Sequence, residues 1–375
     1  MILRETGRTQ EMAAGVLGIS DLFQKNCTEI LQKIFLYLDP RSLHSSRQVC
    51  QQWNIFILSS VWGSRSGFNS LQRRLHYNWL NKEPELLNVA TTEGVYGLRA
   101  LTDNCLVVSD VDGGAKVIDL VSQEILAHLN HPDIVYEAVI TETWIITANR
   151  GLTYIWNRET FEKMQALYAN SFDFVAAETG DRALYVSFSN VDDLTLYKTS
   201  PEKSQEEKIL VIPEMVQNSL LFKNDDTLSL VTVDMKTQFF RIYEVLKGDV
   251  VTRTFGDAER DSIVCSLSVS RSHLISVHWD CVDLRDNGKM KVWDMDTSSK
   301  LYSIDINSMP DSVVIQNNLV KIASRDKIFV FDGTTIGDET SVIKSKREIS
   351  FDLRRKVLFN KSMAVNYDTI MNFWN

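Results

Sequence analysis

The richest group of side chains that could do chemistry lies in the sequence HWDCVDLRDNG, residues 278–288. It offers an imidazole, a thiol and three carboxylates that could surround a metal ion, namely His278, Asp280, Cys281, Asp283 and Asp286. Their spacing fits neither a zinc finger nor the Asp-x-Asp-x-Asp-Gly loop that holds calcium. Because surface loops are often simply polar, we interpret this stretch as a loop between two strands and expect no metal or cofactor.

Motifs of catalysis are missing from the rest of the sequence. It has no glycine-rich phosphate loop, no His-Glu-x-x-His and no Gly-x-Ser-x-Gly nucleophile elbow. The six histidines are dispersed, and an isolated histidine near a strand is more often structural than a base. Asp112 and Asp368 stand at tight turns, where a short carboxylate can accept backbone amide bonds. We therefore predict that the protein is not an enzyme.

The composition indicates which kinds of partner are disfavoured and which cellular compartment is expected. The 375 residues are 44% hydrophobic and 24% charged, as in ordinary globular proteins. A formal charge of −9 disfavours general attraction to nucleic acid or to an anionic membrane. The five cysteines are scattered without a Cys-x-x-Cys pair, which favours free thiols in a reducing compartment. No signal peptide or membrane-spanning run is present, so we expect a cytoplasmic or nuclear protein.

Because the sequence offers few catalytic groups, surfaces that could bind a partner are its more informative feature. Residues 26–62 have the apolar spacing of a small helical unit. Asn26 can cap its first helix, with Glu29 reaching back to the free backbone amides. Asp39 and Pro40 end this helix and start the next. The apolar residues at helical spacing are Ile30, Leu31, Ile34, Phe35 and Leu38, then Leu43, Val49, Trp53, Phe56 and Ile57. A unit this small buries little surface, so we expect its apolar face to bind a partner.

A different pattern begins near Glu85, where short β-branched and aromatic runs repeat. Seven copies of a strand end in an aromatic or aliphatic residue, usually followed by a polar one: AKVID, TYIWN, LTLYK, FRIYE, MKVWD, IFVFD and MNFWN. Successive copies end 38 to 50 residues apart, which matches the period of a four-stranded propeller blade. The last copy ends at Asn375 and leaves its blade one strand short. Residues 85–89 (ELLNV) can supply that strand and close the ring.

These two regions resemble known families. The helical unit resembles an F-box, with a Val-Cys-x-x-Trp ending at Val49, Cys50 and Trp53, although Asn26 and Cys27 replace the usual Leu-Pro opening. The matching residues are Glu29, Ile30, Leu31, Ile34, Phe35, Leu38, Asp39, Pro40, Leu43, Val49, Cys50 and Trp53. The repeats resemble WD repeats, with Trp-Asp intact at residues 293–294 and Gly-His weakened to residues 130–131 (Asn-His). Together they resemble the F-box/WD-repeat proteins.

The resemblance implies a mainly β protein in which a small all-α F-box domain precedes a seven-bladed WD-repeat propeller. We expect an irregular segment over 1–24, the F-box over 25–66, a helical connector over 67–84 and the propeller over 85–375. It also implies a substrate-recognition subunit of an SCF-type ubiquitin ligase. The F-box would dock on a Skp-type adaptor and through it on a cullin, with Trp53, Leu31, Phe35 and Leu38 as anchors. The propeller would hold the target protein.

In such proteins the target surface is the propeller face that carries the turns between second and third strands and the connections between blades. Four arginines map to that face and could grip a phosphate, namely Arg150, Arg260, Arg285 and Arg325. Nine acidic residues map there too and would repel it, namely Asp110, Asp192, Asp193, Asp257, Glu259, Asp261, Asp280, Asp283 and Asp326. Scattered, solvated charge is the simpler interpretation.

Two other classes of function stay open at this point. A propeller scaffold or adaptor could bind partner proteins without ubiquitin transfer, and retention of adaptor binding without a cullin would identify it. An enzyme built on the propeller would need a convergent polar pocket, which the repeats do not show.

Overall fold

The computed structural model describes residues 23, 27–36, 38, 46–62, 70–88, 95–120, 122–149, 151–168, 173–180, 182–190, 192–224, 227–245, 252–257, 262–270, 272–280, 287–316, 318–350, 357–360, 363–365 and 369–372. The chain divides into two compact units, Met1–Leu71 and Gln72–Asn375.

The first unit is helical, as predicted. Its described elements are helix α2 (Thr28–Leu36), helix α4 (Gln51–Phe56) and the π-helix η1 (Ile57–Trp62). Helix α2 begins after Cys27, whose carbonyl accepts a hydrogen bond from the backbone N–H of Leu31 at 3.1 Å. The predicted cap, Asn26, and the predicted helix break at residues 39–40 lie outside the described residues.

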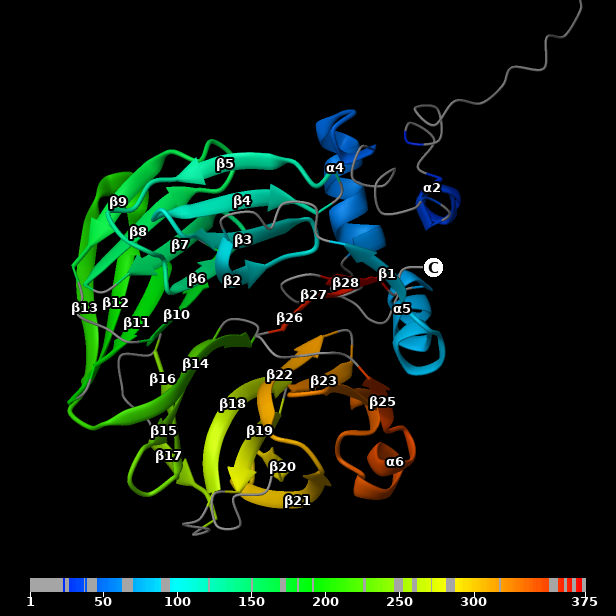
Figure 1. Ribbon diagram of the computed structural model, residues 1–375, viewed down its shortest axis with the longest axis vertical. Coiled ribbons are helices and arrows are strands. Elements are labelled where there is room, and N and C mark those ends of the chain that lie inside the picture. Colours follow the sequence, from blue (N-terminus) through cyan, green and yellow to red (C-terminus); the bar gives the residue numbers. More distant parts are fainter. Residues whose placement is uncertain are drawn as a thin grey trace, which may run out of the picture. The chain divides into compact units, whose positions relative to one another are not determined.

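The second unit is built mainly of strands. Helix α5 (Ser70–Asn81) belongs to it from Gln72 onward, and the shorter helices in it are η2 (Pro201–Lys203), η3 (Gly333–Thr335) and α6 (Glu339–Lys344). The described strands form seven four-stranded antiparallel sheets, which follow one another around a ring in Figure 1. The first strands of successive sheets contact one another, for example β2 with β6 and β14 with β18, so these strands line the centre.

Six sheets are blades made of four consecutive strands each. Their strands are β2 (Val95–Leu101), β3 (Cys105–Asp110), β4 (Ala115–Asp119), β5 (Ile125–Leu129); β6 (Glu137–Ile140), β7 (Trp144–Asn149), β8 (Leu152–Asn157), β9 (Lys163–Leu167); β10 (Asp173–Glu178), β11 (Leu184–Ser189), β12 (Leu194–Ser200), β13 (Gln205–Ile212); β14 (Val216–Asn224), β15 (Thr227–Asp234), β16 (Phe240–Glu244), β17 (Thr252–Phe255); β18 (Ser262–Ser270), β19 (His273–Asp280), β20 (Gly288–Asp294), β21 (Ser299–Ile306); and β22 (Pro310–Gln316), β23 (Leu319–Ser324), β24 (Lys327–Asp332), β25 (Arg347–Ser350).

The remaining sheet is composite, and it is not a blade of consecutive strands. It joins β26 (Leu358–Phe359), β27 (Met363–Val365) and β28 (Thr369–Asn372) to β1 (Glu85–Asn88). Strand β1 pairs antiparallel with β28, from Glu85 opposite Asn372 to Asn88 opposite Thr369. The predicted pairing of the ELLNV segment with the last strands is therefore confirmed, whereas contiguous blades are shown for six of the expected seven.

The repeated motif is the third strand of its sheet in every case. Where the copy ends in Asp or Asn, that side chain can hold the next turn, as three of the copies show. The Oδ1 atoms of Asp119, Asn157 and Asp294 accept backbone N–H groups two or three residues later at 2.7–3.0 Å. In four sheets the pairing of third and fourth strands also shifts register within the motif, which adds a β-bulge at the same place.

The tight turn before β4 differs from the prediction in one residue. We expected the carboxylate of Asp112 to hold it, but Asp110 does so: its Oδ1 accepts the Asp112 N–H at 3.3 Å and its Oδ2 pairs with Lys116 Nζ at 2.8 Å. Asp110 is the last residue of β3 and therefore stands at the start of the turn, where its carboxylate can accept a backbone N–H group of the turn. The corresponding Asp368 lies outside the described residues.

Replacing Gly114 in this turn with alanine should lower the free energy of unfolding by about 1–3 kcal/mol, the usual cost of a strained backbone conformation. Gly114 has φ +81°, and a Cβ there would lie 2.6 Å from the Leu129 carbonyl oxygen. Urea unfolding of the full chain would measure the loss. Gly180→Ala is the matched control, because only the Lys223 Nζ lies within 4.0 Å of its Cβ position. Equal effects of the two changes would contradict the prediction.

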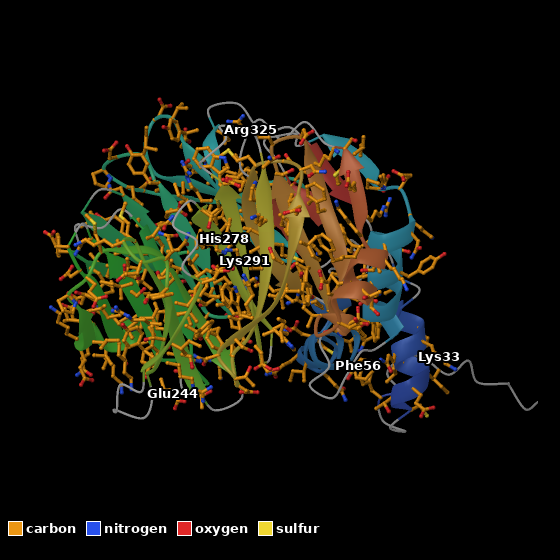
Figure 2. All side chains as sticks on the ribbon, turned by 90° about the horizontal axis from the view of Figure 1, so that it is seen from below. Lys33, Phe56, Glu244, His278, Lys291 and Arg325 are labelled. Carbon is orange, nitrogen blue, oxygen red and sulfur yellow. The ribbon has the colours of Figure 1, made fainter. Side chains whose placement is uncertain are left out.

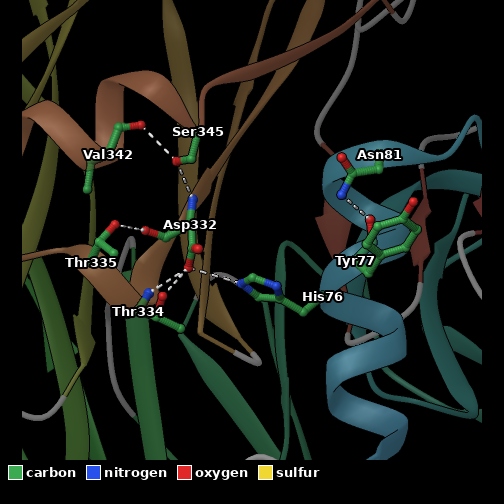
Figure 3. Close-up of polar contacts among 8 residues, drawn as sticks. All are labelled: His76, Tyr77, Asn81, Asp332, Thr334, Thr335, Val342 and Ser345. Carbon is green, nitrogen blue, oxygen red and sulfur yellow. Dashed lines mark hydrogen bonds and ion pairs between the residues drawn. The ribbon is translucent and has the colours of Figure 1, made fainter.

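Helix α5 is fastened to the sixth blade, as Figure 3 shows. His76 Nε2 lies 3.0 Å from Asp332 Oδ1, at the end of β24. Burial would raise the pKa of Asp332, but hydrogen bonds from Thr334 and the nearby His76 bring it below its usual value. Arg347 Nη1 donates to the carbonyls of Asn78 and Trp79 at 3.2 and 2.8 Å. From Gln72 onward, the helix in the predicted connector (67–84) thus belongs to the second unit.

Candidate functional site

The first unit is held together by an aromatic cluster. Phe35 of α2 contacts Trp53 and Phe56 of α4, with ring centroids 5.3 and 5.9 Å apart. Phe23 packs on all three rings at 5.3–6.5 Å. Such tilted and edge-on contacts are favourable beyond the buried area. The cluster fixes α2 against α4.

Polar contacts complete this unit. Gln32 Nε2 donates to the Ser60 carbonyl at 2.8 Å, which ties α2 to η1. Arg47 Nε donates to Asn54 Oδ1 at 2.9 Å, which ties α4 to the segment before it. Cys50 occupies the N-cap position of α4, and its carbonyl accepts the Asn54 N–H at 3.1 Å. The residues around position 50 therefore lie at the regular start of helix α4.

The second unit has two opposite faces. We call upper face the one that carries the turns between second and third strands and the connections between blades. Figure 2 shows Arg325, in the turn between β23 and β24, at one edge, and Glu244, at the end of β16, at the opposite edge. Arg325 is exposed on the upper face. The other three predicted arginines, at 150, 260 and 285, lie outside the described residues, so the phosphate-binding cluster stays a prediction.

Several acidic residues of the upper face are already paired within the protein. Asp257 holds both Lys291 Nζ at 2.9 Å and Lys300 Nζ at 2.5 Å. Asp326 Oδ1 accepts the Ser308 hydroxyl at 2.9 Å. Burial would raise the pKa of Asp257, but hydrogen bonds from the two lysines lower it below the usual value. These carboxylates repel an incoming anion less than their number suggests.

A cavity of about 270 Å³ opens on the upper face between the third and fourth blades. It is lined by Asp192, Pro213, Glu214, Met215, Asp234 and Lys236. Arg241 pairs with Glu214 and lies 3.5 Å from Asp234 Oδ2, so two of the three carboxylates have an internal partner. Sequence reasoning missed this cavity, because its walls come from three separate loops.

The stretch predicted as a polar loop in the fifth blade is partly strand. His278 lies within β19 and is buried; its Nε2 contacts Ser276 Oγ at 2.7 Å and its Nδ1 contacts Ser262 Oγ at 3.3 Å. Trp293 Nε1 donates to the same Ser276 Oγ at 2.9 Å. Figure 2 shows His278 next to Lys291 in the interior. Burial, reinforced by the charge of Lys291, lowers the pKa of His278 to about 3.

The imagined metal site is therefore divided. His278 is used inside the blade, Asp280 ends β19, and residues 281, 283 and 286 lie outside the described residues. Within the described part of the chain, no group of three or more His, Cys, Asp or Glu side chains could hold a metal ion.

The second blade repeats this polar network with a different histidine. Thr147 Oγ1 accepts from Trp156 Nε1 at 2.7 Å and contacts His131 Nε2 at 2.5 Å. His131 precedes the blade, whereas His278 lies inside its own blade, so the two networks are built from different sequence positions. Burial and the charge of Lys163 lower the pKa of His131 to about 4. Both histidines are structural, as the sequence suggested for isolated histidines.

Comparison with known proteins found similarities for both parts of the chain. Residues 28–66 match the family model described as F-box-like. The propeller is similar to the RRP9 WD40 repeats, with a TM-score of 0.58, 11% identity, and coverage of 77% of this chain and 98% of that chain.

The chain thus has a segment that matches an F-box-like family model, followed by a propeller whose fold is similar to solved WD40 structures.

Other solved structures have a similar fold. The structure of U3-55K gives a TM-score of 0.57 at 11% identity, covering 77% of this chain and 99% of that one. The WD40 domain of Neurospora crassa Pan2 gives 0.53 at 12% identity, covering 77% and 93%. At such identities the likeness shows the fold alone. The comparison with curated proteins found no match. F-box and WD40 modules are typically interaction modules, and no described helix is long and apolar enough to cross a membrane.

The F-box-like segment does not expose all the residues predicted to dock. Leu31 and Phe35, two of the predicted anchors, are 0% and 1% exposed. They form the core of the segment, so neither side chain is exposed to a partner. Neighbouring helix positions differ by about 100° around the axis, so Ile30 points away from the side on which Leu31 is buried.

The exposed apolar residues of the F-box-like segment are Ile30 (51%), Val49 (63%) and Ile55 (59%). Glu29 and Cys50 are exposed as well, and Ile34, Leu38 and Trp53 are half-buried. Ile55 was not predicted, because it lies between Trp53 and Ile57 without belonging to their helical stripe, and the sequence gave no sign that its side faces out. Pro40 and Leu43 lie outside the described residues.

Proposed function

We propose that this protein is a substrate-recognition subunit of an SCF-type ubiquitin ligase. The F-box-like segment would dock on a Skp-type adaptor and through it recruit a cullin, and the propeller would hold the target protein. The observation that carries the proposal is the presence, on one chain, of an F-box-like segment with exposed Ile30, Val49 and Ile55 and of a WD40-type propeller.

The docking surface would consist of exposed and half-buried residues of the F-box-like segment. Exposed isoleucine and valine side chains gain free energy when a partner removes them from water, about 25 cal/mol per Å² of apolar surface. An interface of standard size would bury about 800 Å² on each side. The proposed contacts are Glu29, Ile30, Ile34, Leu38, Pro40, Leu43, Val49, Cys50, Trp53 and Ile55. Leu31 and Phe35 would support them from within.

The propeller would act only by holding the target in place. It would neither make nor break a covalent bond. Holding a target beside a ubiquitin-loaded enzyme raises the local concentration of target lysines, as any bivalent arrangement does. We count the composite sheet as the seventh blade, because its β1–β28 pairing leaves no open edge on β28. The proposed target contacts are on the upper face, with Arg150, Arg260, Arg285 and Arg325 as candidate anion ligands. We place the protein in the cytoplasm or nucleus, where the cysteines, none of which is in a disulfide among the described residues, would stay reduced.

The test uses the full chain with a double substitution, Ile30→Asp and Val49→Asp. Both side chains are more than half exposed, so the free segment should tolerate the change. In the complex each carboxylate would be buried without a partner, which costs several kcal/mol. We expect adaptor and cullin to fall more than tenfold in the co-purified material, measured by quantitative mass spectrometry.

Leu126→Asp is the matched control, because Leu126 is an exposed apolar residue on the outer strand β5 of the first blade. It should leave adaptor and cullin unchanged. Undiminished adaptor binding by the double variant would refute the docking surface. Adaptor without cullin in the unaltered protein would instead favour the scaffold that binds partners without ubiquitin transfer.

A further inference from the structure

Arg99 in strand β2 is a fixed cation with open hydrogen-bonding capacity. Its Nε donates to Ser109 Oγ at 3.0 Å and to the Val135 carbonyl at 2.9 Å. These contacts tie the side chain both to its own blade and to the connection that leads into the second blade. The two terminal nitrogens, Nη1 and Nη2, donate no hydrogen bond in the described structure. A guanidinium has five donors in a planar fork, so four of them are available.

The surroundings keep space for this fork. Gly97 lies beside it, and a Cβ at Gly97 would come within 3.1 Å of Arg99 Nη2 and 3.3 Å of its Cζ. The Tyr96 ring lies on another side, with its centroid 5.6 Å from Cζ, where a cation–π contact helps to orient the guanidinium. Arg99 is therefore positioned before any ligand arrives, which reduces the entropy that binding would cost.

Apolar surface borders the guanidinium at the same end of the blade. Tyr96 is 52% exposed and Val111 is 48% exposed. Both lie at the upper end of the first blade, because each is one residue away from the antiparallel pair Val95–Asp110 of β2 and β3. A ligand on Arg99 would thus find the exposed Tyr96 ring beside the guanidinium and the exposed aliphatic Val111 at the same end of the blade.

The charge around Arg99 suits a single negative charge. Lys116 is already paired with Asp110 at 2.8 Å, so it supplies no second free cation. Burial lowers the pKa of Arg99, and the nearby Glu137 and the tyrosines 96 and 136 partly offset this. A doubly charged phosphoryl group would meet the Glu137 charge with only one guanidinium to balance it. A planar carboxylate matches the fork with two parallel N–H···O bonds.

We propose that Arg99 receives the carboxylate of an aspartate or glutamate in the target protein, with a neighbouring apolar residue of the target packed on Tyr96 and Val111. This inference rests on the proposed function, since it names the class of segment that the propeller would recognise: acidic and hydrophobic, without phosphorylation.

The test is a synthetic peptide array probed with the purified full chain. Each nonamer has Glu, Gln or phosphoserine at the centre, a leucine or phenylalanine beside it, and randomised positions elsewhere. We expect Glu-centred peptides to bind at least tenfold better than Gln-centred ones. Arg99→Gln should abolish this preference, and Arg99→Lys should weaken it because an ammonium cannot form the fork. Arg182→Gln is the matched control, an exposed arginine of the third blade paired with Glu202, and should keep the preference.

Thermal unfolding of each variant would show that the propeller is intact. A stronger preference for phosphoserine than for Glu would overturn the inference in favour of a phosphate site. No preference in the unaltered protein, or the same preference after Arg99→Gln, would overturn it outright. Co-purification of adaptor and cullin, measured on the same variants, is independent of the array and separates failure of this site from failure of the ligase proposal.

Discussion

Replacing Trp79 with alanine should lower the free energy of unfolding of the propeller by about 3–5 kcal/mol, the range for large aromatic residues removed from a core. Trp79 is fully buried, although it comes from helix α5 and not from a strand. It packs in a cluster that contains residues of the sixth blade, such as Leu319 and Ile349, and of the composite sheet, such as Phe359 and Met371. The indole thus fills the seam at which the ring closes.

The loss should be increased by Lys321, which lies beneath the indole. Its Nζ is 4.0 Å from the Trp79 ring centroid and donates to the Asn360 carbonyl at 2.7 Å. Burial lowers the pKa of Lys321 well below its ordinary value. Removing the ring would take away one of the groups that compensate the buried amine. Chemical denaturation of the full chain, followed by intrinsic fluorescence and circular dichroism, would measure the change.

Lys321→Met is the informative companion to this experiment. Replacing a buried ionisable group by an apolar one of similar volume is often neutral or stabilising, so we expect little loss. If Trp79 and Lys321 interact as described, Trp79→Ala should cost less in the Lys321→Met background. Equal costs in the two backgrounds would show that the indole acts only by filling space.

Acidification from pH 7 to pH 5 should destabilise the propeller through two histidines. The folded-state pKa values of His131 and His278 are lowered by burial to about 4 and about 3. An unfolded histidine has a pKa of about 6.5. Between these values the unfolded chain binds protons that the folded chain excludes, so the free energy of unfolding falls as pH falls. Each histidine contributes a slope of about 1.4 kcal/mol per pH unit below pH 6.5.

Urea unfolding at several pH values between 7.5 and 5 would measure this slope. By pH 5 the two histidines together should have removed about 4 kcal/mol. His278→Asn should remove about half of the slope, because asparagine can hydrogen-bond to Ser276 but does not titrate. A pH-independent stability over this range, or an unchanged slope in the variant, would contradict the prediction.

The repeating strands could be predicted because each blade uses the same local chemistry. An aromatic or aliphatic residue packs between sheets, and the Asp or Asn after it holds the next turn, as Asp119 and Asp294 do. Both signals are local in sequence, so they survive even where the Trp-Asp ending is lost. The pairing of β1 with β28 could also be predicted, because one strand was missing and one strand-like segment was left over.

Contacts between distant segments could not be predicted in this way. Lys291 and Lys321 look like solvent-facing strand residues, yet both are fully buried because Asp257 and the Asn360 carbonyl reach them from elsewhere. Helical spacing also placed Ile30 and Leu31 on one stripe, although only one of them faces the core. The fixed position of Arg99 could not be predicted from the sequence, since its partners Ser109 and Val135 lie in other segments.

The pairing of β1 with β28 sets an order of events during synthesis. Strand β1 leaves the ribosome before any blade, but its partner β28 is made only after all six contiguous blades. At roughly 5–20 residues per second the early strand waits for tens of seconds. During that time its edge is unpaired, and such an edge can join a strand of another chain. Ring closure is therefore the most non-local pairing in the fold, and the edge of β1 stays open to chaperones or to other chains until β28 has been made.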